Sequence, residues 1–169
     1  MLRWLFPRLT ADPTRGADLF RWVAGRARQP HWYAEGGVPD TVDGRFAMLA
    51  TIAALVLVRL EHDGDGTEPQ VALTERFVEA MEAEHREMGL GDPKLGRTVR
   101  KLVGSLAGRV DLWRAIADGG DWATGARGSL FGGSEPWPDA VAHAASNLRE
   151  LWLRLKSASQ EEVVAGRIE

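Results

Sequence analysis

The sequence predicts an all-α protein, a single compact domain of about six or seven helices around a central apolar helix at residues 41–61. Apolar residues recur three and four positions apart through most of the chain, and no stretch shows the alternation of a half-buried strand. A length of 169 residues suits one hydrophobic core. Hydrophobic residues at 44% and charged residues at 27% are ordinary for a globular protein.

The first segment, residues 1–12, is a basic and aromatic arm that precedes the expected helical domain at 13–156. Its Trp4, Leu5 and Phe6, together with two arginines, suit the surface of a bilayer. The alternative is that the arm packs over the core of its own domain. The segment has neither a long apolar stretch nor a small-residue cleavage site, so we do not expect a secretory signal.

The first two helices are predicted from their start signals. Asp12-Pro13 is typical of an N-cap followed by proline in the first turn, and an apolar stripe then continues to about residue 28. A short turn at 30–37 follows, and it carries Trp32 and Tyr33.

Asp40 or Thr41 then caps the central helix, which continues to about residue 61. Its longest uncharged run, 46–58, spans about 20 Å as a helix, so it is too short to cross a bilayer core of about 30 Å.

The next two helices carry opposite charge. Residues 61–92 contain ten Asp or Glu against two Arg, a balance of −8, and residues 93–114 contain six Lys or Arg against one Asp, a balance of +5. We expect an acidic helix at 67–88 and a basic helix from 92 to about 110. The glycines at 104 and 108 have a spacing that permits the close approach of another helix.

The C-terminal third is expected to contain a short helical piece to residue 116, a helix at 121–131 and a linker at 132–138. A last amphipathic helix is predicted at 139–156. We expect the tail at 157–169 to be frayed.

Residues that carry chemistry are scarce. The absence of cysteine excludes disulfides, thiolate metal sites and a cysteine nucleophile. Glu82 and His85 have the spacing of a di-iron motif, but no second copy exists, so we expect no metal site. Phosphate-binding, zinc-protease and serine-hydrolase motifs are also absent. We therefore expect no cofactor and no catalytic residues, and the residues alone predict a helical binding protein.

Two blocks of sequence resemble the ubiquinol–cytochrome c chaperone family, whose members assist assembly of the cytochrome bc respiratory complex. The first block is residues 33–46, YAEGGVPDTVDGRF. The second is HREMGLGD at 85–92, followed by GRTVRK at 96–101 and Gly108-Arg109. The resemblance covers roughly residues 15–118. It implies an all-helical, non-enzymatic chaperone for ubiquinol–cytochrome c reductase that binds nascent or newly inserted cytochrome b.

Within this resemblance we assign two groups of residues. Asp40, Thr41, Asp43, Gly44 and Arg45 form a structural motif at a helix start, in which Arg45 can reach a carboxylate of a neighbouring helix. The candidate partner-binding residues are the basic Lys94, Arg97, Arg100 and Lys101, with Trp32 and Tyr33 as aromatic anchors.

The basic residues suit anionic lipid or ribosomal RNA, and the aromatic ones suit an apolar client segment. We expect the protein in the cytoplasm, on the cytoplasmic face of the inner membrane, without specific DNA binding. Two other functions remain open. A carrier of a lipid- or quinone-like molecule requires an apolar pocket beside the central helix, and an enzyme with a dispersed site requires a cleft with convergent ionisable groups.

Overall fold

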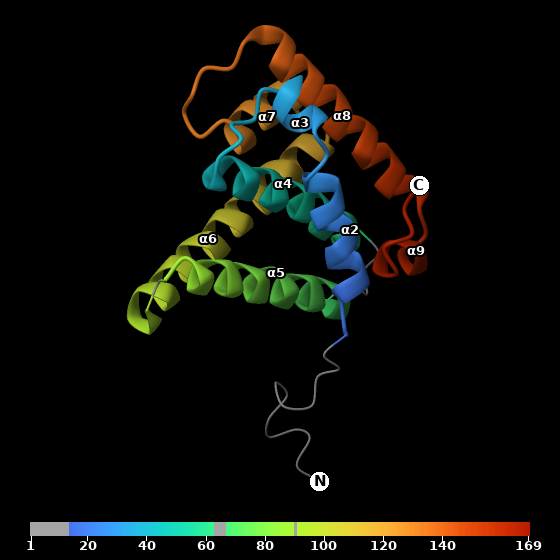
Figure 1. Cartoon of the computed structure of the whole chain (residues 1–169). Coiled ribbons are helices and arrows are strands. Elements are labelled where there is room, and N and C mark those ends of the chain that lie inside the picture. The colour runs from blue at the N-terminus through green and yellow to red at the C-terminus, as the bar shows by residue number, and fades with distance from the viewer. Residues whose placement is uncertain (1–13, 63–66, 90) are drawn as a thin grey trace.

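The computed structural model describes residues 14–62, 67–89 and 91–169. In this part of the chain it contains eight helices and no strand, which confirms the all-α prediction. The labels follow Figure 1, and the bounds are α2 (Ala17–Ala27), α3 (His31–Ala34), α4 (Val42–Glu61), α5 (Thr67–Glu87), α6 (Asp92–Ala117), α7 (Trp122–Leu130), α8 (Pro138–Ser157) and α9 (Gln160–Val164). The predicted arm at 1–12 lies outside the described residues.

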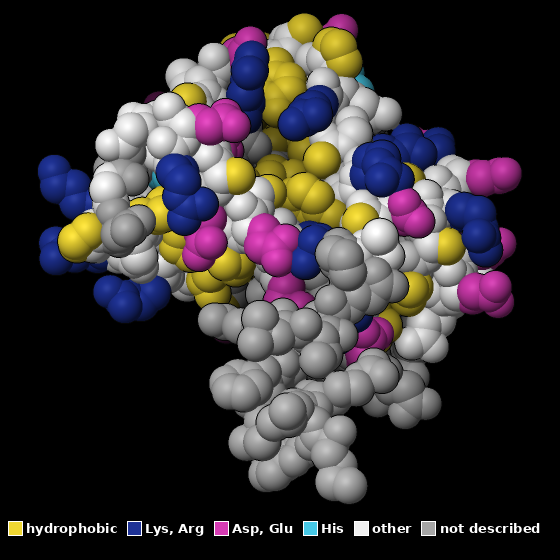
Figure 2. All heavy atoms as spheres, turned by 60° about the horizontal axis from the view of Figure 1, so that its bottom comes forward, with side chains coloured by type: hydrophobic (Ala, Val, Ile, Leu, Met, Phe, Trp, Pro, Cys, Tyr) yellow, Lys and Arg dark blue, Asp and Glu magenta, His cyan; other side chains and the backbone are white. Residues whose placement is uncertain are grey.

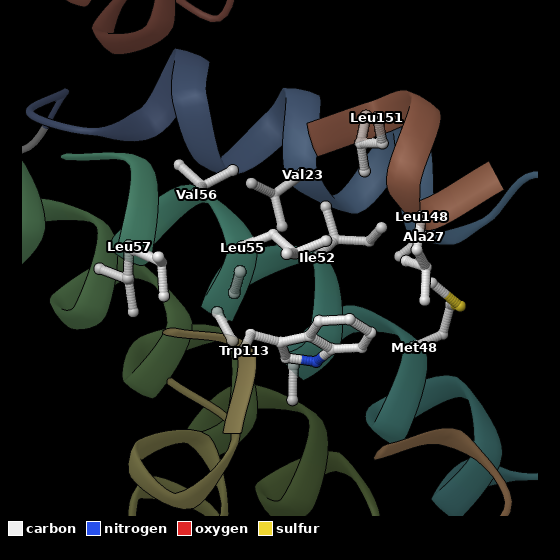
Figure 3. Packing of buried hydrophobic residues seen from close by; sticks show 14 of the residues in the cluster. Val23, Ala27, Met48, Ile52, Leu55, Val56, Leu57, Trp113, Leu148 and Leu151 are labelled. Atoms are coloured by element: carbon white, nitrogen blue, oxygen red, sulfur yellow. The ribbon is translucent and has the colours of Figure 1, made fainter. Parts of the chain in front are cut away.

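Helix α4 is the centre of the fold, as the sequence predicted. Fourteen of its twenty residues are buried, because α2, α5, α6, α7 and α8 all contact it. Trp113 of α6 reaches the helix from one side and Val23 of α2 from another, with Ile52 and Leu55 between them (Figure 3). A helix enclosed on all sides needs apolar residues around its whole circumference, which explains the uncharged run at 46–58.

Helices α5 and α6 form a long hairpin that extends away from the other helices (Figure 1). Their far end lies between the last residue of α5 and the first of α6, and Gly89 there adopts a φ of 86° that favours glycine. The other end of the hairpin packs on α4. The basic helix is longer than predicted, since α6 continues without a break from residue 92 to 117.

The C-terminal tail differs from its prediction. We expected residues 157–169 to be frayed, but they contain α9, which starts with a capping box between Ser159 and Glu162. Val163 and Ile168 are buried, and the Trp22 indole donates a hydrogen bond to the Ile168 carbonyl at 3.2 Å. The prediction failed because this segment is held by α2, which is distant in sequence.

The spacing of the two glycines in α6 permits a close helix approach, but no described residue makes one there. Gly104 and Gly108 are exposed, and a Cβ added at either position meets no atom within 4 Å. Their side of α6 faces outward.

Candidate functional site

The start of α4 is built by the residues assigned to the structural motif. Thr41 is the N-cap, and its hydroxyl accepts a hydrogen bond from the Gly44 backbone N–H at 3.1 Å. Gly44 is buried under the incoming chain, where a Cβ would lie 1.8 Å from the Pro39 carbonyl oxygen. Only glycine leaves room for this crossing.

Arg45 forms an ion pair, but its partner differs from the one expected. Its Nε lies 2.7 Å from Asp40 Oδ1, so the carboxylate belongs to the turn before α4 and not to a neighbouring helix. Asp43 is exposed in the first turn of α4, where its negative charge is favourable.

The two predicted aromatic anchors hold the α2–α3 turn together. Trp32 is only 3% exposed, and its indole donates to the Arg26 carbonyl at 2.8 Å. Tyr33 is half-buried, its hydroxyl donates to the Ala27 carbonyl at 2.8 Å, and burial raises its pKa. Trp32 is therefore wrong as a surface anchor in this structure, because its indole has no exposed face to offer.

The exposed tryptophan of the described residues is Trp137, which is 54% exposed. It precedes α8 and contacts Gly37 in the turn before α4. Both residues lie in turns of the sequence, but the structure buries Trp32 and leaves Trp137 exposed. Both tryptophans lie within two residues of a proline at a helix start, so the local sequence does not distinguish the buried one from the exposed one.

The four basic residues of α6 lie together on its outer side, as predicted. Lys94, Arg97, Arg100 and Lys101 are all exposed. Spacings of three and four place Lys94, Arg97 and Lys101 on one line along the helix, about 10 Å long. None of the four is in an ion pair with another described residue. We call these four residues the basic face.

The acidic side chains of α5, unlike the basic face, form ion pairs with described residues. Arg15 of the chain before α2 bridges Glu68 and Glu75, at 3.2 and 3.1 Å. Arg76 binds Glu79 at 2.7 Å. These ion pairs neutralise part of the acidic surface, whereas the basic face has no counterion among the described residues.

The other titratable groups that the structure describes are involved in local contacts. The His31 Nδ1 and His143 Nε2 atoms are 3.0 Å apart, and burial and this second imidazole hold the pKa of His31 below its usual value. The partly buried Arg109 donates to the Ser129 carbonyl and lies over the Phe46 ring, and burial lowers its pKa. The described residues contain no group of three metal-ligating side chains, and His85 bonds the Met81 carbonyl of its own helix.

Two hollows on the described surface bear on the carrier hypothesis. One, of about 80 Å³, lies between α2, α3 and α8 and is lined largely by polar groups, among them Arg26, Gln29 and Asn147. The other is an open depression beside α9. Neither is an apolar chamber beside α4.

Among the described helices, none combines the length and apolar character needed to cross a membrane. The predicted membrane contacts Trp4, Leu5 and Phe6 lie outside the described residues.

The comparisons with known proteins agree with the resemblance in the sequence. The family model described as "Ubiquinol-cytochrome C chaperone" matches residues 34–127, which is more than half of the chain. The chain belongs to the ubiquinol–cytochrome c chaperone family. The matched region of this chaperone contains the α4 start, the hairpin and the whole basic face.

A solved structure resembles the chaperone over its full length. The crystal structure of the Cbp3 homolog from Brucella abortus is 26% identical, with a TM-score of 0.79, and the alignment covers 100% of this chain and 96% of the other. No curated protein matches the sequence.

Proposed function

We propose that this protein is a non-enzymatic assembly factor for ubiquinol–cytochrome c reductase that binds newly made cytochrome b. Its membership of the chaperone family supports the general role, because the family model covers the centre of the fold. The basic face, for which the described residues supply no ion-pair partner, is the observation that carries the finer proposal, because it supports attachment to the anionic membrane or ribosome at which the client is made.

The electrostatic cost of the basic face is the first argument. Like charges three and four positions apart destabilise a helix by about 0.2–0.5 kcal/mol for each pair. Nothing in the described fold offsets this repulsion at Lys94, Arg97 and Lys101. An external anionic surface offsets it, and each Lys or Arg near an anionic membrane gains about 1 kcal/mol.

The position of the basic face is the second argument. It lies on the first half of α6, next to the far end of the hairpin (Figure 1). A surface there can contact a membrane or a ribosome while the rest of the molecule stays free for the client. We therefore place the protein on the cytoplasmic face of the inner membrane, where cytochrome b is inserted.

Deletion of the gene tests the assembly role. We expect a loss of cytochrome b and of the assembled bc complex, with another respiratory complex at its normal level. A normal level of bc complex in the deletion strain would overturn the proposal.

Charge reversal tests the basic face separately. The double variant Arg97→Glu with Lys101→Glu is expected to fold but to fail in restoring the deletion strain. The matched control is Arg149→Glu with Lys156→Glu on α8, which changes the charge equally at exposed positions outside described ion pairs. If both variants restore assembly equally, the basic face has no role.

A further inference from the structure

The hollow between α2, α3 and α8 gathers polar groups that the described fold does not use up. Its volume is about 80 Å³. A water molecule takes up about 30 Å³ in the liquid, so this space holds a few waters or one small ion. Its polar lining consists of Arg26, Gln29, His31, Asn147, Glu150 and Arg154. We call this site the polar hollow.

Two arginines line the polar hollow from different helices. Arg26 of α2 is partly buried, and its guanidinium lies 5.2 Å from the centre of the Trp22 ring and 3.4 Å from the Ile168 carbonyl. Arg154 of α8 pairs with Glu150 through Nη2. The remaining nitrogens of both guanidinium groups have no partner among the described residues. Because Glu150 balances only one of the two arginines, the hollow keeps a positive charge.

A chain of hydrogen bonds holds the amide of Gln29. Its Oε1 lies 3.1 Å from His31 Nε2, and an amide oxygen only accepts, so this His31 nitrogen carries the proton. The other nitrogen of neutral His31, Nδ1, then accepts from His143 Nε2 at 3.0 Å. Burial and the His143 imidazole keep the pKa of His31 below its usual value, which favours this neutral form. The NH₂ group of Gln29 has no partner in the described part of the chain and remains a donor at the hollow.

Asn147 supplies an acceptor to the same space. Its Nδ2 donates to the His143 carbonyl at 2.8 Å, one turn earlier in α8. Its Oδ1 accepts no hydrogen bond from a described residue. The polar hollow therefore offers two guanidinium groups, one amide NH₂ group and one amide oxygen.

This set of groups fits a phosphate group better than a carboxylate. A single guanidinium fork satisfies both oxygens of a carboxylate. A phosphate group has at least three acceptor oxygens, so two guanidinium groups and an amide can bind it together. A protonated phosphate oxygen can also donate, which gives the Asn147 Oδ1 atom a partner.

We propose that the polar hollow binds a phosphate group between Arg26 and Arg154. Gln29 donates to a further oxygen, and the protonated oxygen donates to Asn147. The bound group connects α2 with α8 and stabilises the position of the tail that Arg26 contacts. The proposal goes beyond the assembly role and does not depend on the identity of the client.

The polar hollow lies apart from the basic face. In Figure 2 several Lys and Arg side chains gather at the left edge, on the side where Figure 1 shows the far end of the hairpin. The hollow lies on the other side of the molecule, between α2, α3 and α8 (Figure 1). Binding at the two sites can therefore be tested with separate variants.

Titration of the full chain with inorganic phosphate at constant ionic strength tests the site. The indole N–H of Trp32, which lines the hollow and bonds the Arg26 carbonyl, reports binding through its NMR resonance. The test variant is Arg26→Gln with Arg154→Gln. The matched control is Arg21→Gln with Arg149→Gln, which removes one exposed arginine from each of the same two helices outside the hollow.

We expect saturable phosphate binding to the parent and the control, and binding weaker by about tenfold or more in the test variant. Arg154→Gln alone changes only an exposed side chain, so it keeps the fold and should also weaken binding. Sulfate has no proton to donate to Asn147 and should bind the parent more weakly than phosphate. An unsaturable response of the parent, or equal affinities of the test variant and the control, would overturn the proposal. Sulfate binding as tight as phosphate would overturn the role of Asn147.

A second measurement distinguishes free phosphate from a lipid headgroup. Parent and test variant are sedimented with phosphatidylcholine vesicles that contain phosphatidic acid. Weaker sedimentation of the test variant supports a headgroup as the source of the phosphate, and equal sedimentation beside normal phosphate binding of the parent supports the free ion. The Arg97→Glu, Lys101→Glu variant should bind inorganic phosphate as the parent does. Loss of phosphate binding in that variant would place the anion on the basic face and overturn the proposal.

Discussion

Helices α4 and α6 differ in how much of their surface the rest of the molecule buries. The surface of α4 is almost entirely buried inside the molecule, and even its polar Thr51 and Arg59 are enclosed. Helix α6 packs one side against α4 and α5, while its other side carries the basic face followed by two exposed glycines. The comparison teaches that the motif at the α4 start shapes the chain that enters the core, whereas the basic face of α6 lies exposed and forms no ion pair with another described residue.

The largest expected effect comes from Gly44→Ala at the start of α4. The new Cβ would overlap the Pro39 carbonyl, so the chain before α4 has to move. We expect a loss of more than about 4 kcal/mol in the free energy of unfolding, measured by urea denaturation. Unchanged stability would show that the turn before α4 is not fixed by this crossing.

The inner side of α6 provides the second test. Trp113 is completely buried against α4 and donates to the Ser129 hydroxyl at 3.2 Å. Trp113→Ala is expected to cost about 3–5 kcal/mol in the same measurement. Trp137→Ala is the control and should change stability by less than about 1 kcal/mol, because that indole is largely exposed. Similar losses for the two variants would contradict the assignment of Trp137 to the surface.

A smaller effect is expected from Thr41→Ala. The substitution removes the acceptor of the Gly44 N–H, and the loss of an N-cap costs about 1 kcal/mol. Thr41→Ser keeps the acceptor and should retain the stability of the parent chain. A full-sized loss in the serine variant would mean that the methyl group, and not the cap, matters.

The smallest expected effect has the opposite sign. Gly104→Ala places a methyl group in open space on the outer side of α6. An exposed glycine inside a helix is less favourable than alanine by about 0.5–1 kcal/mol, so we expect this variant to be more stable. Destabilisation would show that the outer side of α6 is covered in solution.

Local signals in the sequence were enough to predict the central helix. The thirteen-residue uncharged run and the cap at Thr41 predicted residues 41–61, and the structure has α4 at Val42–Glu61. The helices expected to start at residues 67 and 92 are α5 and α6, which begin at Thr67 and Asp92. The exposed position of the basic face followed from helical periodicity alone.

The errors concern contacts between distant segments. Trp32 is buried by its position under the α2–α3 turn, and Ile168 is buried by α2. Helical periodicity does not show which turn another segment covers or whether a tail finds a partner. The glycine spacing in α6 is uninformative for the same reason, because a pattern that permits close packing does not supply the second helix.

The most direct test of the central claim is the capture of newly made cytochrome b. The tagged protein is isolated from cells after a short radioactive pulse, and the labelled proteins bound to it are identified. We expect labelled cytochrome b to be enriched with the parent protein and with the Arg149→Glu, Lys156→Glu control, and to be lost with Arg97→Glu, Lys101→Glu. The absence of labelled cytochrome b from the parent sample would contradict the account.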